Sequence, residues 1–404
     1  MNSVFFALVL AAFATAAWHE ATLSPGAMEA LSAATLKAAE GAVPLALGLV
    51  GVMALFLGLM KVAEEAGLLA GLARALSPLL RRLFPELPEG HPALGAMTMN
   101  VSANLLGLGN AATPFGIRAM EALQTLNPRQ GAASNAQVLF LAINTAGITL
   151  LPTKVIALRA SLGSADPAAV VAPTLIATLV ASAAAVAAAR ALEGKPETRT
   201  EPAATAASPW AVVPALAVAV LLAALAVAWG RAAGPWLVPV LVLGLLGLGV
   251  ARGVRVYEVF VDGAREGFAV AIRIIPYLVA ILVAVGMLRA SGALDMALAP
   301  AGRLLAPLGV PPEALAMAVV RTLSGSGAYG LLAASLQNAA TGPDTPAGIL
   351  LSTIYASTET TFYVIAVYFG AVCIRRIRHA LAAGLIADAA GLAAAIVACR
   401  LLYG

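Results

Sequence analysis

The sequence is short of charge. Asp, Glu, Lys and Arg make up 11% of its 404 residues, against about 25% in an ordinary soluble domain. Apolar residues make up 61%, and the mean hydropathy is +0.93. This composition indicates an all-α polytopic membrane protein whose main partner is the lipid bilayer. The net charge of +4 is small and the basic residues fall in short loops, so we expect no nucleic-acid partner.

Residues that support common chemistries are also scarce. The two cysteines, Cys373 and Cys399, exclude a disulfide scaffold, and the three histidines are too scattered for a metal site. No Walker loop, H-E-x-x-H pair or nucleophile elbow is present. Residues 325–330 fit G-x-G-x-x-G, but no βαβ pattern surrounds them, so a dinucleotide site is not expected. The sequence therefore predicts neither an enzyme nor a bound cofactor.

Two polar, glycine-rich stretches interrupt the apolar sequence, at residues 100–114 and 321–330. Such residues interrupt a helix and leave backbone N–H and C=O groups without helical partners. In a bilayer, these groups are tolerated only where they line a cavity or contact a ligand. We therefore predict two re-entrant helical hairpins, at about 92–123 and 312–337. Each forms one half of a binding site that we expect at the interface of two repeats.

A span with polar residues in its middle follows each hairpin, at about 133–151 and 349–369, and we expect both to be unwound there. Glu359 is the acidic residue most deeply embedded in apolar sequence, which predicts contact with a solute or with a coupling ion, Na⁺ or H⁺. The alternative is a structural carboxylate that accepts hydrogen bonds from hairpin backbone. Asp388 is also embedded, and we interpret it as a packing partner of Arg375 or Arg378. The candidate solute-binding residues are Asn104, Asn110, Thr113, Asn144, Thr145, Thr149, Ser324, Ser326, Ser357, Thr358, Glu359 and Thr360.

The two hairpins and two interrupted spans divide the chain into repeats. We predict a first repeat at 1–192, a linker at 193–208, one extra span at 209–231 and a second repeat at 232–404, which the extra span inverts relative to the first. This gives about nine spans with the N-terminus cytoplasmic and the C-terminus outside the plasma (inner) membrane, since that arrangement places about two thirds of the basic residues inside. Amphipathic helices at the membrane interface are expected at 24–40, 67–84, 254–270 and 292–308.

The sequence resembles the spore maturation proteins A and B joined end to end. HPALGAMTMNVSANLLGLGNAATPFGIRAMEAL and PTKVIALRAS are similar to protein A, while RVYEVFVDGA, LSGSGAYG and STETTFYVIAVYFG are similar to protein B. These families carry the nucleoside-recognition or Gate domain, and their layout is similar to that of concentrative nucleoside transporters. The resemblance implies that substrate and sodium are held by residues 110–114, 144–149, 324–327 and 357–361. Those transporters have a Gln-Thr-Glu run where this chain has Asn110–Pro114, so the resemblance does not imply nucleoside specificity.

We therefore expect a secondary transporter for a small polar solute, nucleoside-like or an organic anion. We expect it to be ion-coupled, to work by alternating access at a midplane site, and to form a homo-oligomer. The resemblance also leaves open a non-transporting membrane scaffold or sensor of the spore-maturation type.

Overall fold

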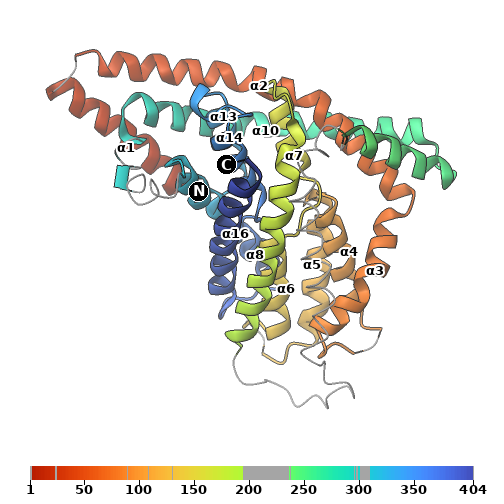
Figure 1. The fold of residues 1–404 in the computed structure, drawn as a ribbon. Coiled ribbons are helices and arrows are strands. Elements are labelled where there is room, and N and C mark those ends of the chain that lie inside the picture. Colours follow the sequence, from red (N-terminus) through yellow and green to blue (C-terminus); the bar gives the residue numbers. More distant parts are fainter. Residues whose placement is uncertain are drawn as a thin grey trace. The chain divides into compact units, whose positions relative to one another are not determined.

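The computed structural model describes residues 2–22, 25–88, 90–107, 109–129, 131–193, 236, 238–294, 296, 299–300 and 310–403 (Figure 1). Across these residues the regular structure is helical, apart from one isolated bridge between Ala132 and Arg376. Three of the helical segments are long and apolar enough to cross a membrane: Phe5–Thr22, Pro167–Ala191 and Ala380–Tyr403. The chain is thus a helical membrane protein. The predicted extra span at 209–231 lies outside the described residues, and the total of about nine spans stays a prediction.

The chain folds into two compact units. Unit one comprises Met1–Gly58, Thr153–Pro167 and Val261–Tyr355, and unit two comprises Leu59–Pro152, Ala168–Phe260 and Ala356–Gly404. Each unit thus takes residues from both predicted repeats, 1–192 and 232–404. The division into repeats remains a prediction about the sequence.

Unit one contains two long helices that pack closely. They are α2 (Ala27–Glu65), most of which lies in this unit, and α10 (Val256–Ala290). A side chain at Gly267 of α10 would lie 2.6 Å from Ala54 Cα of α2, and one at Gly286 would lie 3.0 Å from Ala38 Cβ. These two contacts show that the helices run antiparallel, with glycine allowing their backbones to approach. The other helices of unit one are α1 (Asn2–Thr22), α7 (Thr153–Ser161), α12 (Glu313–Leu323), α13 (Gly325–Leu336) and α14 (Pro346–Ala356).

The long helices differ from the sequence prediction. An interfacial helix at 24–40 followed by a separate span was expected, and α2 instead continues through Pro44. The same holds for the helix expected at 254–270, because α10 continues through Pro276. One proline removes one backbone hydrogen bond and kinks a helix without having to end it. In α2 and α10, the change from amphipathic to apolar sequence therefore does not coincide with the end of a helix. Much of the helix expected at 292–308 falls outside the described residues.

Unit two is a helical bundle. Its described helices include α3 (Leu68–Leu83), α4 (Pro92–Leu105), α5 (Gly109–Thr125), α6 (Asn135–Ala146), α8 (Val171–Ala191), α15 (Thr361–Ala371) and α16 (Ala380–Tyr403), together with a shorter apolar helix at Val238–Ala251. Helices α4 and α5 lie side by side, as do α8 and α16 (Figure 1). The buried residues between α8 and α16 are small, including Ala181, Ala185, Ala383, Ala387 and Gly391. Small residues let helices approach closely within a bilayer.

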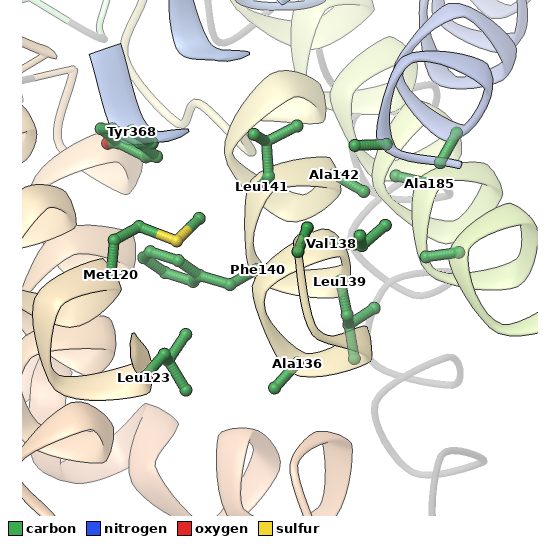
Figure 2. Packing of buried hydrophobic residues seen from close by; sticks show 14 of the residues in the cluster. Met120, Leu123, Ala136, Val138, Leu139, Phe140, Leu141, Ala142, Ala185 and Tyr368 are labelled. Carbon is green, nitrogen blue, oxygen red and sulfur yellow. The ribbon is translucent and has the colours of Figure 1, made fainter. Parts of the chain in front are cut away.

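Aromatic and aliphatic side chains form the core of unit two around Phe140 of α6. Met120 and Leu123 of α5 face this ring, and Ala185 of α8 packs on the other side of α6 (Figure 2). The ring of Tyr368 on α15 stacks on Phe140 with 6.1 Å between centroids and 7° between planes. This core fixes α6 between α5, α8 and α15.

Local sequence explains where the helices around this core begin. At α4, the His91 Nδ1 atom accepts the N–H of Ala93 at 3.3 Å and Pro92 fills the first position. At α6, Ser134 and Gln137 form a capping box, in which each side chain bonds the backbone of the other. Both caps hold helices that carry candidate site residues at their far ends.

The two predicted hairpins are present as helix pairs. In unit two, α4 and α5 are joined through Leu106 and Gly107, and Gly107 has a φ of 74° that favours glycine. In unit one, α12 and α13 are joined by a single extended residue, Ser324, with φ −155°. Whether either pair re-enters the membrane stays a prediction.

Candidate solute-binding site

The helices break where polar residues predicted unwinding. α6 ends at Ala146 with Gly147 in the left-handed region at φ 42°, and the next helix, α7, starts at Thr153. Likewise α14 ends at Ala356 and α15 starts at Thr361. Residues 147–152 and 357–360 are therefore two unwound segments.

Within unit two, these segments satisfy backbone carbonyls that the helix ends leave free. The Leu150 N–H donates to the carbonyl of Leu105, at the end of α4, over 2.9 Å. The Glu359 N–H donates to the carbonyl of Thr145, at the end of α6, over 2.7 Å. The tip of the first hairpin and both unwound segments therefore meet. In apolar surroundings, the backbone groups that an interrupted helix leaves free must find hydrogen-bond partners of this kind.

A network of three buried side chains and the half-buried Asn104 fixes the same junction. Asn104 Nδ2 and the Tyr368 hydroxyl both donate to Asn144 Oδ1, at 3.1 and 3.2 Å. Asn100 Nδ2 donates to the Tyr368 hydroxyl at 3.1 Å and to the carbonyl of Ala112 at 2.8 Å. The amide network, as we call Asn100, Asn104, Asn144 and Tyr368, thus joins α4, α6 and α15. Asn104 and Asn144 are among the candidates predicted from the sequence, whereas Tyr368 was missed.

Glu359 lies beside the break in α6. A side chain at Gly147 would lie 3.2 Å from Glu359 Cγ and 3.3 Å from the Asn144 carbonyl. Glu359 is half-buried, whereas its neighbours Thr358 and Thr360 are buried. The carboxylate is therefore the charged group at this junction of tip and unwound segments.

Other candidate residues of unit two lie on the same helices and segments. Thr145 is buried, and its hydroxyl donates to the carbonyl of Leu141 in the same helix at 3.1 Å. The Thr149 hydroxyl donates to the carbonyl of Gly147 at 3.1 Å. Ser357 is buried, and Thr113 is half-buried on α5. The side chain of Asn110 lies outside the described residues.

Ser324 and Ser326 belong to unit one. The Ser324 Oγ atom accepts the N–H of Gly327 at 3.0 Å and so caps α13, while Ser326 is exposed. One turn before this cap, buried Arg321 has its guanidinium carbon 4.6 Å from the centroid of the Tyr355 ring. The Tyr355 ring in turn contacts that of Tyr329 with 5.8 Å between centroids. This cation–π group was missed in the sequence, where an arginine just before a Ser-Gly break was the available signal.

A second buried arginine in unit one is structural. Arg159 of α7 is fully buried and donates to the carbonyls of Asp166, Pro167 and Pro343. It also lies 3.4 Å from a carboxylate oxygen of Asp344, whose other oxygen accepts the Ala165 N–H at 2.7 Å. Burial acts to raise the pKa of Asp344, and the hydrogen bonds from Ser164 and Ala165 together with Arg159 outweigh it and lower that pKa. This Arg159–Asp344 clamp fastens the end of α7 to the loop before α14.

Comparison with known proteins agrees with the sequence resemblance. Residues 46–162 and 271–375, together more than half of the chain, match the Gate model, described as nucleoside recognition. Spore maturation protein A of Bacillus subtilis (strain 168) is 44% identical over 152 residues, which are 38% of this chain and 78% of that protein. Spore maturation protein B of the same organism is 41% identical over 168 residues, which are 42% of this chain and 93% of that protein.

The fold also aligns with a solved structure of CNTnw in an outward-facing state. The alignment covers 98% of this chain and 91% of CNTnw at 15% identity, with a TM-score of 0.46. The assignment to a family rests on the sequence matches and not on this alignment. On those matches, the chain belongs to the Gate family of nucleoside-recognition proteins, with the spore maturation proteins A and B among its relatives.

Proposed function

We propose that this protein is a secondary transporter of a small polar solute, nucleoside-like or an organic anion. The observation that carries the proposal is the junction in unit two, where a hairpin tip meets two interrupted helices through the Leu150–Leu105 and Glu359–Thr145 bonds. Interrupted helices in a membrane protein typically mark the place where a solute or ion binds. Membership of a nucleoside-recognition family agrees with this function.

Glu359 is the group that we assign to the solute or its coupling ion. A half-buried carboxylate in a chain of this hydropathy is costly unless a donor or cation compensates it. Beside the two unwound segments, this carboxylate is placed where it can bind hydroxyl or amine groups of a solute, Na⁺ or a proton. Asn104 and Asn144 would contribute polar groups next to it, and Ser324 and Ser326 remain candidates in unit one.

The amide network supports a hairpin tip that opens and closes, as alternating access requires. Asn104 of the tip is tied to Asn144 by one neutral hydrogen bond of 3.1 Å. Such a bond contributes about 0.5–1.5 kcal/mol net. Opening the tip breaks this bond and the Leu150–Leu105 backbone bond, and contacts with solute or ion can replace both.

A scaffold or sensor is the second candidate function, and a specific observation favours it. Asn144 Oδ1 already accepts two hydrogen bonds inside the protein, from Asn104 and Tyr368. A junction whose polar groups already hydrogen-bond one another needs no solute to satisfy them. The names of the spore maturation relatives also fit such a role.

A ligand screen separates the two functions. Purified protein would be tested for thermal stabilisation by nucleosides, dicarboxylates and amino acids, with and without sodium, and any stabilising solute would then be tested for uptake into proteoliposomes. We expect one solute class to raise the melting temperature. Glu359→Gln should need at least ten times more of that solute for the same shift, which corresponds to a loss of about 1.4 kcal/mol in binding free energy. The matched control is Glu258→Gln, which neutralises an exposed acid on α10.

The outcomes are distinct. Binding with uptake that Glu359→Gln abolishes and Glu258→Gln preserves supports the transporter. Binding without uptake supports a sensor. If no solute class shifts the melting temperature and Glu359→Gln behaves as the parent protein, the transporter proposal is wrong.

A further inference from the structure

Asp388 lies in the middle of α16, a helix apolar enough to cross a membrane. Its Oδ2 atom accepts a hydrogen bond of 2.7 Å from the hydroxyl of Thr361, which is the first residue of α15 and is fully buried. The sequence interpretation paired Asp388 with Arg375 or Arg378, and that pairing stays a prediction. Arg378 donates to the carbonyl of Ala133 and to Asn135.

The face of α16 that carries Asp388 lies directly against the second unwound segment. One turn before Asp388, a side chain at Gly384 would lie 2.7 Å from Thr361 Cγ2. One turn after it, a side chain at Gly391 would lie 2.9 Å from Thr358 Cγ2 and 3.6 Å from the Ser357 carbonyl. Two glycines thus bring the helix backbone close, and the residue between them on this face is ionisable.

We propose that Asp388 is a proton-binding site that senses the position of the start of α15. The ionised carboxylate is favoured by the Thr361 hydroxyl and by the positive end of the α15 helix dipole. The apolar surroundings favour the neutral acid. When the start of α15 moves away, the ionised form loses the hydrogen bond from Thr361 and Asp388 takes up one proton from water. Proton binding is thereby linked to the conformation of residues 357–361.

The charges around Asp388 are consistent with such a site. Among the described residues of α6 and α15 no side chain carries a formal charge, and the arginines of α8 and α16, Arg190 and Arg400, lie in the last turns of those helices. The unwound segment contributes Glu359, a second carboxylate. Apart from Glu359, the fixed charges of these elements therefore lie at helix ends.

The use of this proton in transport rests on the proposed function, while proton binding itself does not. If Asp388 binds a proton but no solute is taken up, the proposed function fails and this inference stands. If solute is taken up but Asp388 does not titrate, the inference fails alone.

The test is infrared difference spectroscopy of the purified full-length protein during a pH change, without any solute. We expect a carboxylic-acid C=O band that appears on acidification, is lost in Asp388→Asn and persists in Glu359→Gln. Thr361→Val removes the donor to the ionised form and should move the midpoint of this band up by about one pH unit. Thr361→Ser retains the hydroxyl and should leave the midpoint unchanged.

If Asp388 is merely structural, its substitution should lower the melting temperature without changing the titration of the carboxylic-acid band. A band that persists in Asp388→Asn, or a midpoint that is the same in Thr361→Val and Thr361→Ser, overturns the proposal. The threonine pair decides the matter even if Asp388→Asn does not fold.

Discussion

The hydroxyl end of the Tyr368 ring occupies the space that a side chain at Gly116 would fill. A Cβ atom built at Gly116 overlaps the Tyr368 hydroxyl, and glycine at this position of α5 lets the tyrosine reach Asn100 and Asn144. The two residues are far apart in sequence, and their complementarity determines how α15 fits against the first hairpin.

Gly116→Ala should therefore destabilise the protein. We expect a loss of about 1–3 kcal/mol, because an added methyl in a packed core forces neighbouring side chains aside. The control is Gly95→Ala in α4, where nothing lies within 4 Å of the added atom, so its helix propensity should stabilise slightly. The readout is the melting temperature in detergent, and equal values for the two variants would contradict the packing described.

Tyr368→Phe tests the amide network without changing the core volume. Loss of the hydroxyl removes a donor from Asn144 Oδ1 and an acceptor from Asn100 Nδ2, both buried. We expect about 1–3 kcal/mol of destabilisation and faster amide exchange in the peptide that contains Asn104. Tyr363→Phe removes an exposed hydroxyl from the same helix and should leave both quantities unchanged. An unaltered exchange rate in Tyr368→Phe would show that the network does not hold the tip.

The breaks in the helices could be predicted because their causes are local. Glycine, asparagine and proline disfavour a continuous helix where they cluster, at the hairpin turns and the first unwound segment, and the Ser-Thr-Glu-Thr run at 357–360 is the corresponding local signal in the second. The amide network could be predicted only in part. Asn104 and Asn144 stand out as polar residues in apolar sequence. Tyr368 is an aromatic residue in an apolar run, and its hydroxyl bonds Asn144, which is 224 residues away.

The long helices and the buried arginines show what local patterns leave open. Pro44 and Pro276 are compatible with a break and with a continuous helix, and the continuous helices α2 and α10 pack against each other within unit one. No individual role was assigned to Arg159 from the sequence. Its role depends on loop carbonyls more than 180 residues away, at Pro343. Contacts of this range have no signature in a single sequence.

The Arg159–Asp344 clamp predicts a specific dependence on pH. The folded protein lowers the pKa of Asp344, so the clamp stabilises the fold above the unfolded pKa of about 3.9 and loses this contribution as the pH falls through the lower, folded pKa. Asp344→Asn should lower the melting temperature at neutral pH and flatten its decline in acid below about pH 4. The carboxylate is partly exposed, so we expect a shift of only a few degrees.

Asp262→Asn is the matched control for the clamp. Asp262 pairs with Arg265 at 3.4 Å, and both side chains are mostly exposed. Exposed pairs contribute about 0–1 kcal/mol, so this variant should follow the pH profile of the parent protein. Identical profiles for Asp344→Asn and Asp262→Asn would mean that the clamp is not a pH-dependent stabiliser.

Gly147→Ala tests whether the break in α6 positions Glu359. The left-handed φ of 42° costs a non-glycine residue about 1–2 kcal/mol, and the added methyl would press on Glu359 Cγ at 3.2 Å. Gly67→Ala carries a comparable backbone cost at φ 79° with nothing within 4 Å of the new atom. Both variants should lose similar thermal stability, since the backbone cost is common to them. We expect only Gly147→Ala to weaken stabilisation by the solute found in the ligand screen, because only this variant displaces the carboxylate. Equal solute responses in the two variants would place Glu359 outside the binding site, whatever their melting temperatures.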